Sequence, residues 1–202
     1  MLDIDFGTYP FVTSSNCSAG GAVTGSGVGM KYVDRVLGIA KAYITRVGSG
    51  PFPTEIPEDD SDGDKLCEIG GEYGVTTGRK RRCGWYDAVT IAYAARVNGL
   101  TDLAITKLDV LSAFETIKVC VAYDCDGQIL RTAPQNQTLF HHAKPVYEEV
   151  KGWNCDISGC CTFDELPQAA KDYISFIEKL SGVRVSSVAV GPSREQTIMR
   201  NW

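Results

Sequence analysis

The chain has 202 residues, of which 44% are hydrophobic and 22% are charged, so it is long enough to bury a core and has the composition of a globular protein. Its net charge of -5 and isoelectric point near 5.1 argue against a protein that wraps nucleic acid, because such proteins carry a broad basic face. No apolar run approaches the roughly 18–20 residues of a membrane span, and the N-terminus lacks a signal sequence. We therefore expect a cytoplasmic protein that binds neither nucleic acid nor membranes.

The N-terminal half contains several short predicted elements. A strand followed by a loop is expected within residues 2–15, and the Gly-rich segment 17–29 is either a flexible connection or the start of a helix. Residues 31–37 suit a helix and 39–47 suit a strand. The acidic segment 55–65 is typical of a solvated surface loop.

The C-terminal half has clearer periodicity. Helices are predicted over 86–97 and 166–180, because apolar residues follow a helical stripe and each segment ends before a glycine. Strands are predicted over 103–106 and 183–190, and a β-hairpin over 116–132. Strands that alternate with helices indicate a single α/β unit over residues 1–202, with a mostly parallel central sheet flanked by helices.

The eight cysteines are expected to be free thiols, since they are scattered and no signal sequence directs the chain to an oxidising compartment. A zinc site is the alternative for the Cys and His residues of the C-terminal half. Those residues are Cys120, Cys125, His141, His142, Cys155, Cys160 and Cys161. They lack the tight ligand spacing of structural zinc sites, so we predict no metal site in the chain.

The stretch GVTTGRKRRCGW, residues 74–85, places four cations in a row within an acidic protein. Thr76, Thr77 and Gly78 allow a tight turn, while Arg79 and Arg81 would point to one side of an extended loop. Guanidinium groups bind carboxylates and phosphates in a bidentate manner, and the N-terminus of the helix predicted after this loop would add positive charge. A small dianion is the expected ligand, and the alternative is a solvated basic turn or a localisation signal rich in Lys and Arg.

Two further segments lie at the ends of predicted strands. Asp109, in the sequence TKLD, could accept two hydrogen bonds from guanine, and the Lys107 stem could cover the purine face. The alternative for Asp109 is a helix cap. The segment VAVGP, residues 188–192, ends a predicted parallel strand, where ligands of open α/β sheets collect, although it could be only a turn. We expect the arginine-bearing turn and Asp109 to face a common cavity.

Seven collinear stretches resemble the C-terminal half of adenylosuccinate synthetase. They are LDIDFGTYPFVTSSN, TRVGSGPFPTE, GEYGVTTGRKRRCGW, TKLDVL, PVYEEVKGW, LPQAAKDYI and VGPSREQTI. Members of that family are ligases of purine biosynthesis that phosphorylate the 6-oxygen of IMP with GTP, after which the amine of L-aspartate displaces the phosphate. The resemblance implies the C-terminal part of that P-loop-like fold, a cytoplasmic homodimer, and Mg²⁺ as cofactor.

The resemblance also implies roles for residues that match the motifs of the family. The aspartate-binding residues would be Val75, Thr76, Thr77, Gly78, Arg79, Lys80 and Arg81. The IMP-binding residues would be Thr13, Val47 and Arg79. The GTP-binding residues would be Arg81, Lys107, Leu108, Asp109, Ala189, Val190 and Gly191. The family often has serine where this chain has Ala189, so a backbone contact is expected there.

The catalytic residues of the family are expected outside this chain. In the family, the N-terminal half carries the glycine-rich phosphate loop, the catalytic aspartate and histidine, and the Mg²⁺ ligands. None of these features matches this sequence. We therefore expect residues 1–202 to be inactive alone, as an excised fragment or one half of a split polypeptide. A non-catalytic guanine-nucleotide-binding module is the alternative function.

Overall fold

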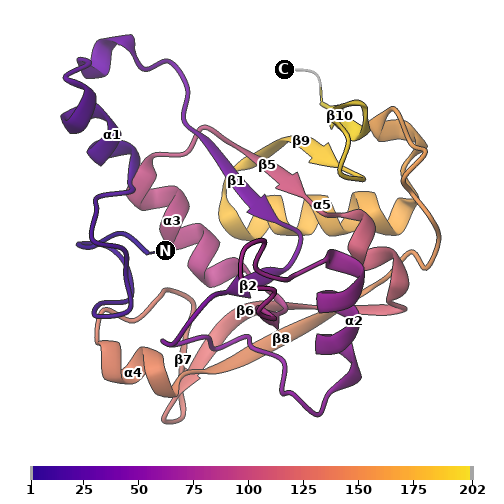
Figure 1. Ribbon diagram of the computed structural model, residues 1–202, viewed down its shortest axis with the longest axis horizontal. Coiled ribbons are helices and arrows are strands. Elements are labelled where there is room, and N and C mark those ends of the chain that lie inside the picture. The colour runs from indigo at the N-terminus through magenta and orange to yellow at the C-terminus, as the bar shows by residue number, and fades with distance from the viewer. Residues whose placement is uncertain (1, 201–202) are drawn as a thin grey trace.

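The computed structural model describes residues 2–200 as an α/β fold whose first sheet has four strands. The strand order is β1 (Leu37–Lys41), β5 (Asp102–Thr106), β9 (Arg184–Ala189) and β10 (Thr197–Met199). The first three strands are parallel and β10 is antiparallel to β9 (Figure 1). The predicted, mostly parallel sheet is therefore confirmed for this part of the molecule. The carboxyl ends of β1 and β5 lie side by side, because Lys41 pairs with Thr106.

A second sheet is built around the long strand β6 (Thr116–Cys125). It pairs in parallel with β4 (Tyr86–Asp87) and antiparallel with β7 (Gln128–Leu130) and β8 (Lys144–Lys151). The predicted hairpin is the β6–β7 pair, and Asp126 and Gly127 adopt positive φ angles of 54° and 86° in its turn. The sequence did not predict β8.

The predicted strand over residues 39–47 is wrong as one element. It is divided between β1 and β2 (Ile44–Arg46), and β2 pairs with β3 (Arg82–Gly84) in a separate two-stranded ribbon. Ala42 and Tyr43 lie between the two strands, and both are buried. The backbone N–H of Ala42 still donates to the carbonyl of Thr106 of β5 at 2.8 Å, whereas the next strand pairs with β3. The break carries the chain from the first sheet to the ribbon.

Three predictions for the N-terminal half are also wrong. Residues 2–15 form turns, since the Asp3 carboxylate accepts hydrogen bonds from the backbone N–H groups of Asp5, Phe6 and Ser18. The helix predicted over 31–37 is only a short 3₁₀ turn, η1 (Met30–Tyr32). The acidic segment is a loop only in its first half, because α2 (Ser61–Gly70) begins within it after the cap Asp60.

The remaining helices, and then the remaining 3₁₀ turns, follow in chain order. They are α1 (Ala19–Ser26) in the Gly-rich segment, α3 (Ala88–Asn98), α4 (Gln137–His142), α5 (Gln168–Ser181), and the 3₁₀ turns η2 (Asp109–Ala113), η3 (Phe163–Glu165) and η4 (Arg194–Gln196). The structure confirms the two predicted long helices, α3 and α5, each ended by a glycine in the left-handed conformation. Among the described residues, no helix is long and apolar enough to cross a membrane.

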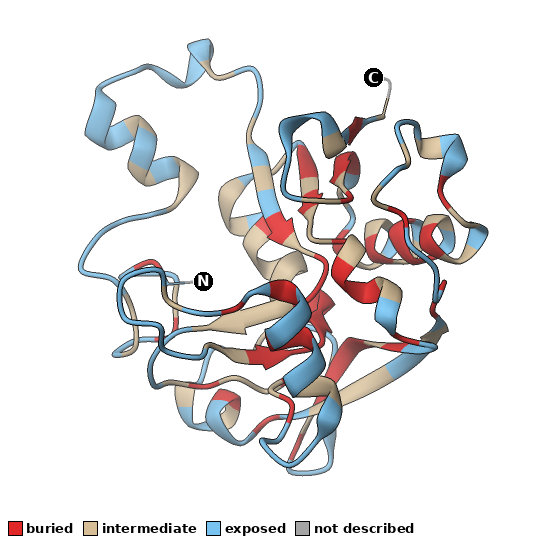
Figure 2. Ribbon diagram, turned by 45° about the vertical axis from the view of Figure 1, so that its right-hand side comes forward, coloured by how far each residue is buried: buried red, intermediate tan, exposed pale blue. Residues whose placement is uncertain are grey.

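The core lies between the sheets and α5, where buried segments gather in the interior (Figure 2). Tyr173 of α5 is fully buried and its hydroxyl donates to the carbonyl of Ala42 at 2.6 Å. This bond attaches α5 to the segment that connects β1 with β2. By contrast, α1 has no buried residue and projects from the body of the molecule. The core therefore fixes the end of β1 and the segment that follows it, through the bond from Tyr173 to Ala42.

Candidate functional site

The loop of residues 74–81, which we call the arginine loop, is a closed turn. The backbone N–H of Gly74 donates to the carbonyl of Arg79 at 2.8 Å, and that of Gly78 donates back to Gly74 at 2.7 Å. Gly78 has a φ of 63°, a conformation that favours glycine, and Thr77 Oγ1 accepts the N–H of Arg79 at 3.3 Å. The tip is open to solvent, with Val75 100% exposed. The predicted tight turn is confirmed, and its polar groups are accessible to a ligand.

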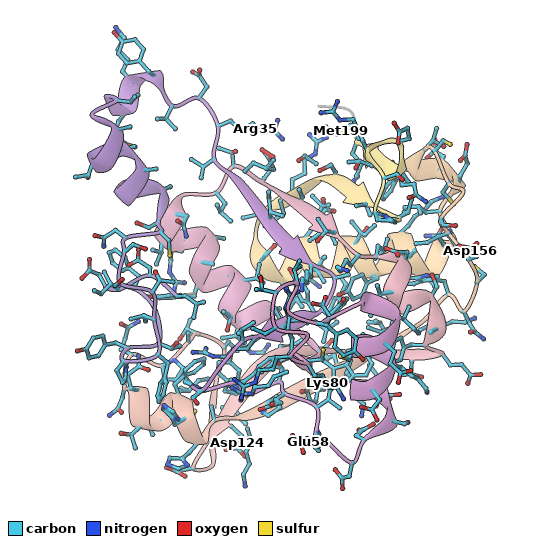
Figure 3. The ribbon with its side chains drawn as sticks, in the orientation of Figure 1. Arg35, Glu58, Lys80, Asp124, Asp156 and Met199 are labelled. Atoms are coloured by element: carbon cyan, nitrogen blue, oxygen red, sulfur yellow. The ribbon has the colours of Figure 1, made fainter. Side chains whose placement is uncertain are left out.

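The four consecutive cations have different partners. Lys80 forms an ion pair with Asp64, and Arg82 donates to Glu55 at 2.6 Å. Figure 3 shows Lys80 beside α2, the helix that carries Asp64. The exposed guanidinium of Arg79, in contrast, has no hydrogen bond to any residue in the described range 2–200. Arg79 is therefore available to bind an anion.

Arg81 forms an ion pair with the buried Glu72, a residue that the sequence analysis did not select. Arg81 Nη1 donates to Glu72 Oε2 at 2.8 Å, and the amine of Lys41 contacts both carboxylate oxygens at 2.8 Å. The hydroxyl of Tyr43 donates to Oε1 at 2.6 Å. Burial by itself raises the pKa of Glu72, but the hydrogen bonds from Lys41, Tyr43 and Arg81 outweigh it and hold the pKa below its usual value. Glu72 is therefore ionised at neutral pH.

The candidate guanine site is assembled from two chain segments. The backbone N–H of Leu108 donates to the carbonyl of Ala189 at 3.1 Å, which joins the segment after β5 to the end of β9. Gly191 is closely packed, since an added Cβ would lie 2.3 Å from the Gln196 side chain. Lys107 has a φ of 59°, and its amine donates to the carbonyl of Gly70 at the end of α2. The two segments therefore lie side by side.

Asp109 has one carboxylate oxygen, Oδ1, that is buried and has no hydrogen-bond partner among the described residues. Burial raises the pKa of this carboxyl group above its usual value. A buried polar oxygen without a partner is unfavourable by about 1–3 kcal/mol, so Oδ1 is a candidate acceptor for a donor group of a ligand.

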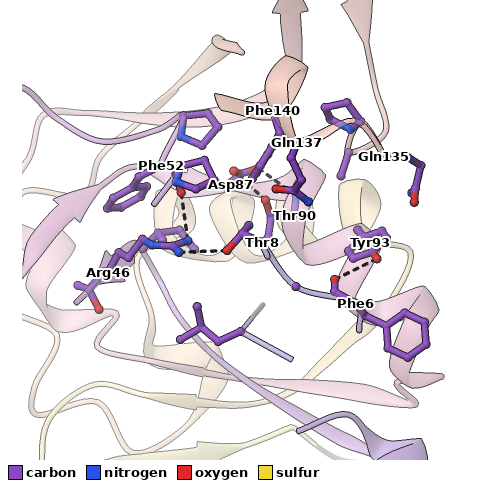
Figure 4. Close-up of a pocket in the computed structure, with 18 of the residues that line it drawn as sticks. Phe6, Thr8, Arg46, Phe52, Asp87, Thr90, Tyr93, Gln135, Gln137 and Phe140 are labelled. Atoms are coloured by element: carbon purple, nitrogen blue, oxygen red, sulfur yellow. Dashed lines mark hydrogen bonds between the residues drawn. The ribbon is translucent and has the colours of Figure 1, made fainter. Parts of the chain in front are cut away.

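The larger cavity has a volume of about 420 Å³ and lies between the N-terminal turns, β2 and α3. Its lining includes Val47, which is 71% exposed. Figure 4 shows Arg46 reaching Thr8, to which its guanidinium donates at 3.0 Å. Thr13 belongs to the same N-terminal turns, and its N–H donates to the carbonyl of Leu2 on the cavity wall at 2.8 Å. Val47 and Thr13 are thus brought to one region of the molecule.

A smaller cavity of about 360 Å³ is lined by residues of the acidic segment together with Lys80 and Arg81. Within the part of the chain that the structure describes, neither cavity includes Asp109 in its lining. Neither of these two cavities is therefore the expected common one. Glu72 instead links the arginine loop to residues 107–109, which we call the guanine segment. Lys107 Nζ lies 3.9 Å from Glu72 Oε1.

The expected contribution of a helix N-terminus to the arginine loop is wrong. The helix α3 starts at Ala88, and its cap Asp87 accepts the N–H of Thr90 at 3.0 Å. Burial raises the pKa of Asp87, which also lines the larger cavity. Trp85 is buried in the core next to Phe114. The positive end of this helix is therefore satisfied by its own cap.

Metal ligands do not cluster in residues 2–200, where no group of three or more His, Cys, Asp or Glu side chains could hold an ion. The eight cysteines are free thiols, and Cys67 and Cys120 are fully buried.

The sequence matches the family model described as adenylosuccinate synthetase over residues 1–198. The chain belongs to the adenylosuccinate synthetase family. It is 57% identical over 199 residues to the adenylosuccinate synthetase of Pelobacter propionicus and 59% identical over 201 residues to that of a Parafrankia species. These alignments cover 98% and 100% of this chain but 46% and 47% of the relatives. The chain thus spans about half the length of the curated adenylosuccinate synthetases that it matches.

Solved structures agree with this family. The fold matches a structure of fully ligated adenylosuccinate synthetase from Plasmodium falciparum with a TM-score of 0.93 and 44% identity, over 99% of this chain and 48% of that chain. Succinoaminodeoxyadenylate synthetase of cyanophage S-2L, bound to dGMP and dATP, matches with a TM-score of 0.57 and 16% identity over 98% of this chain and 43% of that chain. The second match shows a likeness of fold alone.

Proposed function

We propose that this chain supplies the substrate-binding half of an adenylosuccinate synthetase, a ligase that uses GTP to join IMP and L-aspartate in AMP biosynthesis. Membership of the family supports the proposal. The complete enzyme would be a cytoplasmic homodimer that uses Mg²⁺. Since the described residues contain no cluster of metal ligands, we assign Mg²⁺ to no residue of this chain and expect its ligands in the other half.

In this proposal the arginine loop binds the two carboxylates of aspartate. Thr76 and Thr77 would donate to one carboxylate, and Arg79 and Arg81 would bind the other. The exposed turn supports these roles, as does the Arg79 guanidinium, which has no hydrogen bond to any of the described residues. Backbone groups of Val75 and Gly78 and the charge of Lys80 would complete the loop around the substrate.

IMP would contact Thr13, Val47 and Arg79. Val47 supports this role because its exposed side chain forms part of the wall of the larger cavity. Arg46, which connects β2 to the N-terminal turns, would fix that wall. IMP and aspartate would then meet at Arg79, as expected if the amine of aspartate attacks the purine ring of IMP.

GTP would be recognised by its guanine base. The observation that carries this proposal is Asp109 Oδ1, which is buried and has no hydrogen-bond partner within residues 2–200, beside the strand ends of a parallel sheet. Guanine presents two donors, N1–H and the exocyclic amine, to a carboxylate. Lys107 and Leu108 would flank the base on one side, and the remaining contacts would come from Ala189, Val190 and Gly191. Arg81 would reach the phosphates.

This half of the enzyme binds and orients substrates, and we assign no catalytic residue to it. Its contribution to the rate would be the placement of the aspartate amine next to the 6-position of IMP. The proton transfers and the phosphoryl transfer would depend on residues outside this chain.

The test of the aspartate assignment is the Arg79→Ala variant of the complete enzyme. We expect the KM for aspartate to rise by about 10²-fold, because a carboxylate loses its charged partner. Arg131→Ala, which removes an exposed arginine from another part of the surface, is the matched control and should leave that KM unchanged. Normal aspartate saturation in Arg79→Ala would refute the assignment.

A non-catalytic guanine-nucleotide-binding module is the second candidate. It is favoured by the hydrogen bond that joins Leu108 to Ala189, which assembles the guanine site within this chain. Calorimetric titration of the isolated chain with GDP and with ADP separates the two functions. Selective binding of GDP, with no turnover when the other half is added, would support the module, whereas turnover with the other half would support the ligase.

A further inference from the structure

Glu72 connects the two proposed substrate sites. Its side chain is fully buried, with an exposure of 0%, and it forms ion pairs with Arg81 at 2.8 Å, Lys41 at 2.8 Å and Lys107 at 3.9 Å. Arg81 belongs to the arginine loop, and Lys107 belongs to the guanine segment. A single carboxylate therefore contacts a cation from each site.

The position of this carboxylate is fixed by the backbone on both sides. The N–H of Glu72 donates to the carbonyl of Cys67 at 2.8 Å, and its carbonyl accepts the N–H of Arg81 at 2.9 Å. Gly71 ends α2 with a φ of 59°, which turns the chain into this position. Gly70 leaves room for the network, since an added Cβ would lie 2.2 Å from the Tyr43 hydroxyl. Glu72 thus has little freedom to follow a moving partner.

The charges around Glu72 do not balance. One carboxylate, that of Glu72, is surrounded by Lys41, Arg81 and Lys107. These four side chains together therefore carry a net positive charge. The three cationic side chains are 26%, 29% and 39% exposed, which leaves their outer surfaces open to ligands. Anions such as a substrate carboxylate or a nucleotide phosphate would be attracted to this surface. Without Glu72 the three cations would repel one another and separate.

We propose that Glu72 is a positioning residue that couples the aspartate site to the guanine-nucleotide site. This inference rests on the proposed function and adds a residue to it. The carboxylate holds Arg81 at the base of the arginine loop and Lys107 beside the guanine reader Asp109. An anionic ligand that draws Arg81 outward changes how strongly Glu72 attracts Lys107, so the occupancy of one site alters affinity at the other.

The test is the Glu72→Gln variant of the complete enzyme, assayed for the KM of aspartate and of GTP. We expect both values to rise by about tenfold, because the amide keeps the shape but loses the charge. Glu178→Gln is the matched control, since it breaks a partly buried ion pair with Arg200 elsewhere in the fold. That control should change neither KM.

Double-variant cycles separate positioning from a purely structural role. If Glu72 acts through its partners, Glu72→Gln should change the aspartate KM less than about twofold in an Arg81→Gln background. The same limit should hold for the GTP KM in a Lys107→Gln background. Full additivity, a rise in only one of the two KM values, or a change confined to thermal stability would overturn the inference.

If Glu72→Gln fails to fold, Tyr43→Phe provides the test, because it removes one hydrogen bond to Glu72 and keeps every charge. Both KM values should then rise by about two- to fivefold, and unchanged values would overturn the inference. Failure of the proposed function would look different, since the wild-type enzyme itself would not be saturated by aspartate or GTP.

Discussion

Asp102 stabilises the first sheet through a charge network at the start of β5. Its carboxylate is buried and accepts hydrogen bonds from Arg35, Ser186 and Thr101. The bond from Arg35 is the main cause that lowers the pKa of Asp102 from 3.8 to about 2. A carboxyl group with a lowered pKa in the folded state stabilises the protein above its unfolded pKa. At 1.36 kcal/mol per unit, the contribution at neutral pH is about 2 kcal/mol.

We therefore expect Asp102→Asn to lower the free energy of unfolding by about 2 kcal/mol at pH 7. The difference from the wild type should shrink as the pH falls from about 4 toward 2, where protonation removes the same charge from the wild-type protein. Urea unfolding of the chain, followed by tryptophan fluorescence, measures both effects. Asp59→Asn, at an exposed position, makes the same charge change and should cost less than about 0.5 kcal/mol. Equal stabilities for the two variants at pH 7, or a difference that does not shrink at low pH, would refute the reasoning.

Two other predictions concern the arginine loop and the thiols. Gly78→Ala forces a side chain into a φ of 63° and should raise the aspartate KM of the complete enzyme by about fivefold. Gly127→Ala, at a φ of 86° in the hairpin turn, is the control and should leave this KM unchanged. An equal aspartate KM in both variants would contradict a role for the turn at Gly78. Iodoacetamide should label the exposed Cys155 of the native protein and spare the fully buried Cys67, as detected by peptide mass spectrometry. Rapid labelling of Cys67 would contradict the buried packing of α2 described above.

The elements that the sequence predicted correctly are those specified by local signals. The helix α5 has a regular apolar stripe and a glycine stop, and the β6–β7 hairpin has alternating residues around an Asp-Gly turn. The strand over residues 39–47 was wrong as one element because its two parts pair with different partners, β5 and β3, and this pairing is not visible in the local sequence. Strand β8 was missed because it is defined by pairing with β6 more than by its own pattern of side chains.

The candidate site also contains some features that local sequence signals specify and others that depend on contacts between remote residues. The turn at Gly78 could be predicted from residue types and spacing. The anion-binding role of Arg79 stays a prediction. Glu72 could not be predicted, because a single glutamate in a loop gives no signal, and its importance comes from Lys41, which is 31 positions away in the sequence. Oδ1 of Asp109 is buried and has no hydrogen-bond partner among the described residues, which the sequence could not show because burial depends on the fold.

The proposal that Asp109 reads guanine is tested most directly by base selectivity. Inosine triphosphate lacks the exocyclic amine of GTP, so the ratio of kcat/KM for the two nucleotides isolates one hydrogen bond to the carboxylate. In the complete enzyme, Asp109→Asn should lower the preference for GTP by at least about tenfold, since a charge-assisted hydrogen bond contributes about 1.5–3 kcal/mol. Asp156→Asn, at a neighbouring exposed carboxylate, is the control and should keep the wild-type preference. A wild-type ratio in Asp109→Asn would contradict the account.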